Sequence, residues 1–339
     1  MRVKITEVAR VAGVSSATVS KVLSGRAGYS VHAETAQRVR EAAVTLGYVP
    51  DVAARNLRTR QTGQLGVVME AVGSSEPDSL LGGVTVGGAV RRTFDGAIMA
   101  GLSDAARRLE VAALVIYPGG REATPSYFDG RVDGLLLCCD PLRGNALLEL
   151  LQAAPLPLVA LWTGAAPPCM STVDVDHQGG AALATEHLVS LGHVRAAFYG
   201  GGTSSGVEHF RRREEGYRQA MVAAGLRPMT AIHDGQVLVE AVRRGEISAV
   251  FAETDLAAAA AWQALNAAGL RVPEDVSLVG FDDILGAEFI AGGLTTVYHP
   301  AAEMAAEGVN VLMKRLNGAP VSQTLLPTHL ILRRSTRRA

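Results

Sequence analysis

The sequence predicts an all-α helix-turn-helix head joined by a short hinge helix to a larger α/β body, with parallel, doubly wound sheets in two lobes. Three observations predict this architecture. Short helical repeats of apolar residues fill the first 50 residues, a basic decapeptide follows them, and apolar runs then alternate with amphipathic stretches over some 270 residues. The length of 339 residues also exceeds what a single hydrophobic core usually serves.

The charge of the chain is distributed unevenly. Residues 1–62 contain ten Lys or Arg and four Asp or Glu, a net charge of +6, whereas residues 63–339 contain 22 basic and 29 acidic residues, a net charge of −7. A basic head on an acidic body is typical of a nucleic-acid-binding segment joined to a part with another role. A composition of 48% hydrophobic and 19% charged residues excludes a disordered or collagen-like chain.

Three helices are predicted in the head. Apolar residues at helical spacing predict the first, which ends at Gly13. Ser15 stands where the N-cap of the second helix belongs, and the third helix is predicted over Glu34–Leu46, ending at Gly47. Two short helices joined by a tight turn are a helix-turn-helix. The apolar positions of the first two helices are Ile5, Val8, Ala9, Ala12, Val19, Val22 and Leu23.

Short apolar runs separated by amphipathic helices predict parallel sheets in the body, covered on both faces. The predicted strands are Leu65–Met69, Ala112–Ile116, Gly134–Cys138, Leu158–Leu161, Ala196–Tyr199, Ala249–Ala252, Ser277–Gly280 and Thr328–Leu332. The predicted helices are Gly101–Leu109, Gly179–Leu191, Arg213–Ala224 and Leu256–Ala268. The Gly- and Val-rich segment Ala71–Phe94 is predicted to be a long loop.

The head resembles the lactose/galactose-repressor family of bacterial transcription regulators. The matching stretches are Val3–Ala9, Ala12–Ser15, Thr18–Ser24, Leu46–Pro50 and Ala54–Leu57. The resemblance implies a sequence-specific DNA-binding regulator, expected to be a repressor, that binds a pseudo-palindromic double-stranded operator. It also implies a DNA-binding domain over residues 1–50 and a hinge helix and linker over residues 51–62.

The same resemblance implies specific DNA contacts. The second helix is expected in the major groove, with base-reading positions Ser16, Ala17 and Lys21. The expected phosphate contacts come from the hydroxyl groups of Ser15, Thr18 and Ser20, for which helix capping and packing are the alternative roles. In the hinge helix, the resemblance places Ala54 and Leu57 in the minor groove, Leu57 as an apolar wedge. Lysine at position 21, where the family usually has arginine, is expected to discriminate bases less sharply.

The body resembles the effector domain of the same family, which is similar to periplasmic sugar-binding proteins. The matching stretches are Arg131–Gly134, Leu183–Leu188, Leu191–His193, Glu215–Tyr217, Val272–Ser277, Val279–Asp283 and Leu294–Val297. The resemblance implies an effector-binding and dimerisation domain over residues 63–339. Lobe 1 is expected at about 63–161 and 296–322, and lobe 2 at about 162–295 and 323–336. A small polar effector, expected to be a sugar, would bind between the lobes and control operator affinity.

Arg213 and Asp282 match effector-binding positions of the family. A guanidinium and a carboxylate facing one cleft suit a polyol, because hydroxyl groups both donate and accept hydrogen bonds. Asp255 and Trp162 follow predicted strands and are further effector-binding candidates. The alternative roles are a helix cap for Asp255 and packing between the lobes for Trp162.

Other functional classes find little support in the sequence. The three cysteines match no metal-ligand or disulfide pattern, and there is no signal peptide or long apolar run, so we expect a cytoplasmic protein with no metal, cofactor or membrane partner. Gly200–Gly202 resembles a phosphate turn but lacks the rest of that motif, and His177, His187 and His193 have no accompanying nucleophile motif, so no enzyme is expected. The remaining alternative is a DNA-binding regulator with a degenerate sensor that binds no small molecule, because Ala71–Phe94 departs from the family pattern.

A homodimer is expected, since a twofold dimer reads a pseudo-palindrome. Apolar helix faces in Gly101–Leu109 and Gly216–Ala224 are the predicted dimer surfaces. The sequence ends seven residues after Leu332, without two heptads of coiled coil, which predicts a dimer and no tetramer.

Overall fold

The fold comes from a computed structural model, in which the chain divides into two compact units, Met1–Thr62 and Gly63–Ala339. This division coincides with the expected end of the linker. The structure describes residues 3–24, 31–49, 61–70, 86–119, 125–138, 149, 151, 153–154, 156–161, 167–200 and 208–339.

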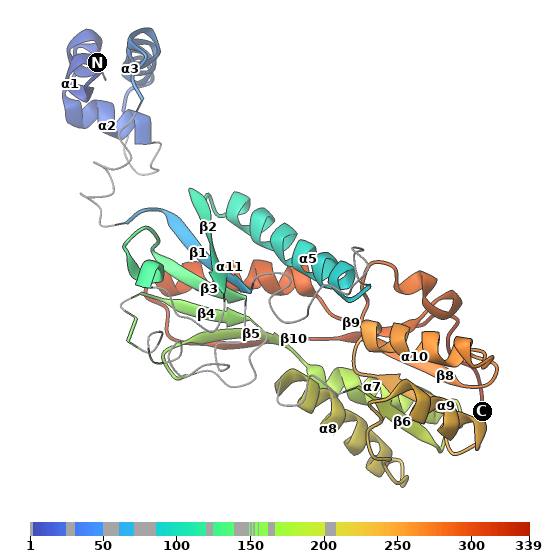
Figure 1. The fold of residues 1–339 in the computed structure, drawn as a ribbon. Helices are drawn as coiled ribbons and strands as arrows, with labels where there is room; N and C mark the ends of the chain where they lie inside the picture. Colours follow the sequence, from blue (N-terminus) through green and yellow to red (C-terminus); the bar gives the residue numbers. More distant parts are fainter. Residues whose placement is uncertain are drawn as a thin grey trace. The chain divides into compact units, whose positions relative to one another are not determined.

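The first unit is a small bundle of helices, and the predicted helices are confirmed (Figure 1). They are α1 (Ile5–Ala12), α2 (Ser16–Ser24) and α3 (Ala33–Leu46). Their apolar faces meet in a core where Val8, Val19 and Val39 have no exposed surface. The spacing of these apolar residues therefore determines how the three helices pack.

The ends of the head helices follow from local chemistry. Gly13 ends α1 and Gly47 ends α3 with φ angles of 66° and 63°, a left-handed backbone that glycine adopts without strain. The Oγ atom of Ser15 accepts a hydrogen bond of 3.1 Å from a backbone N–H in the first turn of α2, so Ser15 is the cap of α2. Lys4 and His32 precede α1 and α3 and make no side-chain cap hydrogen bond.

The second unit contains two sheets, of which the first has six parallel strands in the order β10-β5-β4-β3-β1-β2. Its strands are β1 (Gln64–Glu70), β2 (Ala113–Gly119), β3 (Gly134–Cys138), β4 (Leu158–Leu161), β5 (Ser171–Val175) and β10 (Gln323–Leu326). Two helices, α5 (Val86–Arg108) and α11 (Ala301–Leu316), lie side by side along this sheet (Figure 1). A 3-10 turn, η1 (Pro125–Phe128), precedes β3.

The second sheet has the order β11-β9-β8-β7-β6, and only β11 runs antiparallel to its neighbour among the described strands. Its strands are β6 (Ala196–Tyr199), β7 (Ala249–Ala252), β8 (Ser277–Asp282), β9 (Thr295–Tyr298) and β11 (His329–Ile331). The helical elements are α7 (His177–Ser190), α8 (Glu208–Ala223), α9 (Gly235–Arg243), α10 (Asp255–Ala267) and the 3-10 turn η3 (Ala287–Gly292). Alternate strand residues pack against α7 and α8 on one face and against α9 and α10 on the other.

The chain passes between the two sheets three times, and the crossings correct the expected lobe boundaries. They lie between β5 and α7, between β9 and α11, and between β10 and β11. The predicted boundaries at 161/162, 295/296 and 322/323 were wrong, because they placed β5 and β10 in the second lobe and β9 in the first. These three short strands carry polar residues among apolar ones, so their sequences did not stand out as buried runs.

Several element bounds also differ from the prediction. Strand β2 begins one residue later than predicted and ends at Gly119 instead of Ile116. Strand β8 continues to Asp282, two residues beyond its predicted end at Gly280. Helix α5 begins at Val86, so the end of the predicted loop is helical, while residues 71–85 lie outside the described residues. Helices α9 and α11 were not predicted. None of the helices within the described ranges combines the length and apolar character that crossing a membrane requires.

The apolar helix faces predicted to form the dimer surface pack inside the chain. Leu102 of α5 lies in the core shared with α11, and Tyr217 and Met221 of α8 lie in the core shared with α7. All three side chains have no exposed surface. These three side chains are therefore covered within the chain, because apolar periodicity shows that a helix face is buried without showing which surface covers it, and the dimer surface itself stays a prediction.

The close contact between α5 and α11 generates a test. A Cβ atom built on Gly101 would lie 2.0 Å from the carbonyl oxygen of Ala302 in α11, whereas one built on Gly96 of the same helix meets nothing within 4 Å. We expect Gly101→Ala to lower the free energy of unfolding by about 1–3 kcal/mol, because the helices must separate. Gly96→Ala should leave stability unchanged or raise it by about 0.5–1 kcal/mol, because alanine favours helix.

Urea unfolding followed by circular dichroism measures both variants. Equal effects of the two substitutions would contradict the close packing of α5 against α11.

Candidate functional site

The predicted DNA-reading residues lie on α2 of the first unit. Ala17 and Lys21 are exposed and four residues apart, which places them on the same side of the helix, and Ser16 is partly exposed beside them. This arrangement presents a short, mixed surface of a hydroxyl, a methyl group and an ammonium group. Such a surface can contact base edges in a major groove.

The three hydroxyl side chains predicted to contact phosphate have local roles as well. Ser15 Oγ lies 2.9 Å from Thr18 Oγ1 and also accepts a hydrogen bond from the backbone N–H of Thr18. Thr18 and Ser20 are partly exposed, while Ser15 is exposed. These residues therefore stabilise the start of α2, and their phosphate contacts stay a prediction. Ala54, Leu57 and Trp162 lie outside the described residues, and their roles stay predictions too.

In the second unit, the structure brings Arg213 and Asp282 together. Arg213, on α8, is only 3% exposed, and its Nη2 donates to Asp282 Oδ1 at 2.9 Å. Its Nη1 donates to the backbone oxygen of Glu253 at 2.5 Å, and its Nε donates to His177 Nδ1 at 3.3 Å. The guanidinium carbon lies 3.6 Å from the centre of the Phe281 ring. Every nitrogen of this buried cation therefore has a partner.

Asp282 ends β8 and begins a strained turn. Asp282 and Asp283 have φ angles of 116° and 50°, a range of backbone conformation that residues other than glycine rarely adopt. Arg333 donates to Asp283 Oδ1 at 2.7 Å, and Arg213 holds Asp282. Burial raises the pKa of Asp282, although the charge of Arg213 opposes this shift. Strained backbone held by such contacts is typical of a functional site.

Asp255 has a structural position that the sequence did not predict. It has no exposed surface, and its two carboxylate oxygens accept hydrogen bonds from the backbone N–H of Ile284 and the hydroxyl of Thr296. Burial raises its pKa well above the usual range. The cap of α10 is Thr254, whose Oγ1 accepts from a backbone N–H at 3.0 Å. This geometry favours neither the effector-binding role nor the capping role, and instead makes Asp255 a support for the turn after β8.

A row of histidine rings, which sequence reasoning missed, lies against Arg213. The ring centre of His177 is 5.4 Å from that of His209 and 5.8 Å from that of His299, and His299 lies edge-on to Phe94 of α5 at 5.2 Å. Loss of solvation and the nearby charge of Arg213 lower the pKa of all three histidines, that of His209 to about 2. The rings are therefore neutral at physiological pH. No sequence pattern links the three histidines, because His177 and His299 lie at crossings between the sheets that become visible only in the structure.

The histidine row is not arranged as a metal centre. Its rings stack through their faces, and among the described residues no three His, Cys, Asp or Glu side chains converge as metal ligands do. What the cluster offers is a set of neutral and charged hydrogen-bonding groups beside aromatic faces. Such groups suit a polar organic ligand.

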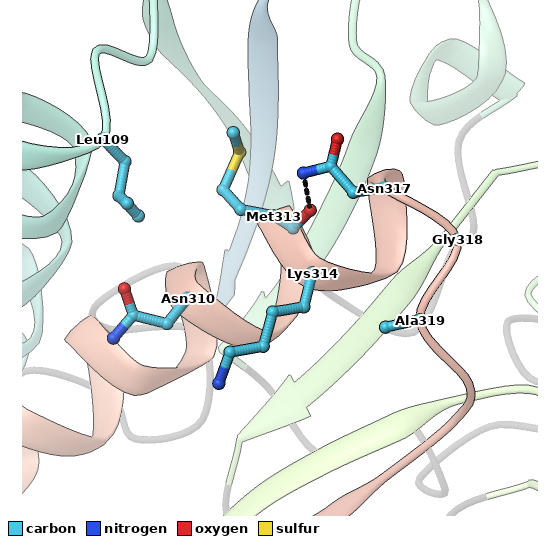
Figure 2. A pocket seen from close by; sticks show the side chains of 7 residues that line it. All are labelled: Leu109, Asn310, Met313, Lys314, Asn317, Gly318 and Ala319. Atoms are coloured by element: carbon cyan, nitrogen blue, oxygen red, sulfur yellow. Dashed lines mark hydrogen bonds between the residues drawn. The ribbon is translucent and has the colours of Figure 1, made fainter.

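A surface hollow of about 740 Å³ lies elsewhere on the second unit (Figure 2). Leu109 borders it on one side, and residues of α11 and the following loop border it on the other, with Asn317 donating to the backbone oxygen of Met313. Leu109 precedes β2 and the α11 residues precede β10, so the hollow lies at the amino ends of the strands. Ligands of parallel sheets bind at the carboxyl ends, where Asp282 and His177 lie, so this hollow is a separate feature.

The neutral histidines predict a pH dependence of stability. In the unfolded chain a histidine takes up a proton below about pH 6.5, whereas in the folded protein these three stay neutral. At these three positions the unfolded state therefore binds more protons, so the histidines contribute a loss of stability as the pH falls below 6.5. The raised pKa values of Asp255 and Asp282 act in the opposite direction. The slope is up to about 1.4 kcal/mol per pH unit for each histidine.

Urea unfolding at pH 5.5 and 7.5 measures this dependence, and His209→Phe should make it shallower. An unchanged slope in that variant would contradict a folded state in which His209 is held neutral.

Comparisons with known proteins agree with this geometry. Residues 4–51 match the family described as bacterial regulatory proteins, lacI family, and residues 185–336 match the family described as periplasmic binding protein-like domain. The HTH-type transcriptional regulator CelR of Thermobifida fusca is 33% identical over 350 residues, which cover 97% of this chain and 96% of the relative.

Two solved structures share the whole fold. A transcriptional regulator CelR–cellobiose complex is 30% identical with a TM-score of 0.66, over 98% of this chain and 100% of that one. A Lac repressor bound to ONPG in the repressed state is 26% identical with a TM-score of 0.74, over 99% and 100%. The predicted helix-turn-helix head and two-lobed α/β body are therefore confirmed, and this chain belongs to the lacI family of bacterial regulatory proteins.

Proposed function

We propose that this protein is a repressor that binds its operator as a homodimer and whose operator affinity is controlled by a sugar bound between its lobes. The observation that carries this proposal is the buried Arg213–Asp282 pair on a left-handed turn at the carboxyl end of β8. The relative solved with cellobiose and the Lac repressor solved with ONPG support a ligand-controlled regulator. In this account the protein works in the cytoplasm and is not an enzyme.

DNA recognition in this proposal rests on α2. Ala17 and Lys21, with Ser16, read base edges in the major groove, while hydroxyl groups at the start of α2 position the head on phosphates. Ala54 and Leu57 of the linker enter the minor groove at the centre of the operator. Two heads in a twofold dimer then read two half-sites of a pseudo-palindrome.

Effector binding in this proposal depends on the exposed part of the Arg213–Asp282 pair, which is the carboxylate of Asp282. The side chain of Asp282 is 15% exposed, whereas that of Arg213 is 3% exposed, so a ligand reaches the carboxylate first. Neighbouring hydroxyl groups of a sugar donate to the carboxylate and accept from donors beside it. Because the site adjoins two crossings between the sheets, a bound sugar stabilises one arrangement of the lobes and thereby changes operator affinity.

One observation favours the alternative of a sensor that binds no small molecule. Each of the three nitrogens of Arg213 already donates to a partner within the chain, so the guanidinium is paired without a ligand. The two functions differ in a measurable way. Only the first predicts that operator affinity responds to a sugar.

Lys21→Ala tests the DNA-reading role of α2. We expect it to reduce discrimination at one operator base pair by about 1–3 kcal/mol, because an amine that contacts guanine is lost. Fluorescence anisotropy with operator variants selected in vitro, at one fixed salt concentration, measures this change. Lys314→Ala, in the second unit, is the matched control and should bind every variant as the original protein does. Unchanged base preference in Lys21→Ala would contradict a reading role for Lys21.

Sugar titration of the operator complex tests the effector role. We expect a neutral sugar to lower the operator affinity by about 5–150-fold, the usual range of allosteric coupling. Asp282→Asn should abolish the response, because it removes the carboxylate that accepts from the sugar. Urea unfolding checks that this variant, in which Arg213 loses its ion-pair partner, is still folded. A protein that binds its operator tightly and ignores every mono- and disaccharide tested would support the alternative of a degenerate sensor.

A further inference from the structure

Lysine is rare in this chain. Of its 32 basic residues, 29 are arginines and three are lysines, namely Lys4, Lys21 and Lys314. The two residue types supply the same charge but differ in chemistry. A lysine amine is a nucleophile that acyl donors convert into a neutral amide, whereas arginine carries its charge permanently. Acylation can therefore remove side-chain positive charge at three positions of this chain.

Lys21 places one of these amines on the DNA-reading side of α2. Its side chain is exposed, as is that of Ala17 one turn earlier, whereas Val19 of the same helix lies in the core of the head. Arginine would serve a base contact at least as well, because its planar guanidinium binds guanine with two hydrogen bonds. What lysine adds at this position is a reactive amine, in a chain that otherwise uses arginine almost throughout.

The other two lysines lie in different surroundings. Lys4 is exposed, directly precedes α1 and makes no side-chain cap hydrogen bond to that helix. Lys314 is exposed on α11 of the second unit, where its Nζ lies 3.6 Å from Oε1 of Glu307. The three lysines therefore occupy a DNA-reading helix, another surface of the head, and an ion pair in the second unit. This difference makes each one a control for the others.

The charge distribution of the chain favours an anionic acyl donor at the head. Residues 1–62 carry a net charge of +6, whereas residues 63–339 carry a net charge of −7. A positive surface raises the local concentration of a small anion, and a negative surface lowers it. Acyl phosphates are anions at neutral pH, so they approach Lys4 and Lys21 more often than Lys314.

We propose that Lys21 is an acylation site through which acyl phosphates weaken operator binding. The neutral amine of Lys21 attacks the acyl carbon, so that a C–N bond forms while the bond between that carbon and the phosphate oxygen breaks. Phosphate leaves with the electron pair of the broken bond, and the amine releases a proton to solvent. The product is a neutral, bulkier amide, which no longer presents an ammonium group to a base edge.

This inference rests on the proposed function, because it adds a second input at the surface that reads the operator. The input acts on α2 directly and does not require the sugar site. A repressor modified in this way would release its operator even when no sugar is present.

Single-lysine variants of the full chain test the inference. Lys4→Arg/Lys314→Arg keeps Lys21 alone, Lys21→Arg/Lys314→Arg keeps Lys4 alone, and Lys4→Arg/Lys21→Arg keeps Lys314 alone. All three have the same charge and the same α-amino group. Each is treated with acetyl phosphate, mass spectrometry measures the acetylated fraction of each lysine, and urea unfolding checks that the treated protein is folded. Fluorescence anisotropy then compares operator affinity before and after treatment at one salt concentration.

We expect the variant that keeps Lys21 to lose operator affinity by about tenfold or more when it is acetylated, because a base contact is lost. Its preference at one operator base pair should weaken as well. The variant that keeps Lys4 can lose affinity only to the same extent for every operator sequence, and the variant that keeps Lys314 should not change. A saturating operator duplex should slow acetylation of Lys21 and leave that of Lys314 unchanged, because the duplex covers α2.

The outcomes separate this inference from the proposed function. If the original protein binds no operator, both fail. If it binds its operator, this inference alone fails when acetylated Lys21 leaves affinity and base preference unchanged. It also fails when Lys21 stays unmodified under conditions that acetylate Lys314. The same loss of base preference in the two treated variants with arginine at position 21 would likewise overturn it, since they have no amine there.

Discussion

Arg213 carries a full positive charge at a place where almost none of its surface meets solvent, and a buried cation is stable only when it is paired and hydrogen-bonded. Its partners come from three other elements: Asp282 at the end of β8, the backbone of Glu253 after β7, and His177 at the start of α7. The hydrogen bonds that pair this one cation join α8 to the start of α7 and to the ends of β7 and β8.

Two further features depend on the same pairing. The turn at Asp282 and Asp283 holds a backbone conformation that is unfavourable for these residues, and ion pairs with arginines hold it in place. The charge of Arg213 also helps to keep the neighbouring histidines neutral, together with their loss of solvation. The result is a neutral, aromatic and hydrogen-bonding group of side chains at the crossings between the two sheets.

Local chemistry explains what was predictable from the sequence. Gly13, Ser15 and Gly47 mark helix ends through contacts within a few residues, so the head was predicted closely. Arg213 and Asp282 followed from the family resemblance. The sheet membership of β5, β9 and β10 depends on pairing between distant segments, and the histidine row joins positions 177, 209 and 299, which only tertiary packing brings together. Burial of Asp255 likewise depends on Ile284 and Thr296, far along the chain.

The central claim is that a sugar at the Arg213–Asp282 site and an operator on α2 act on one equilibrium between two arrangements of the protein. Thermodynamic linkage requires such coupling to be reciprocal. The most direct measurement is the sugar dissociation constant, determined by calorimetry with and without a saturating operator duplex. The account predicts that the operator weakens sugar binding by the same factor by which the sugar weakens operator binding. A sugar affinity that is identical with and without the operator would contradict it.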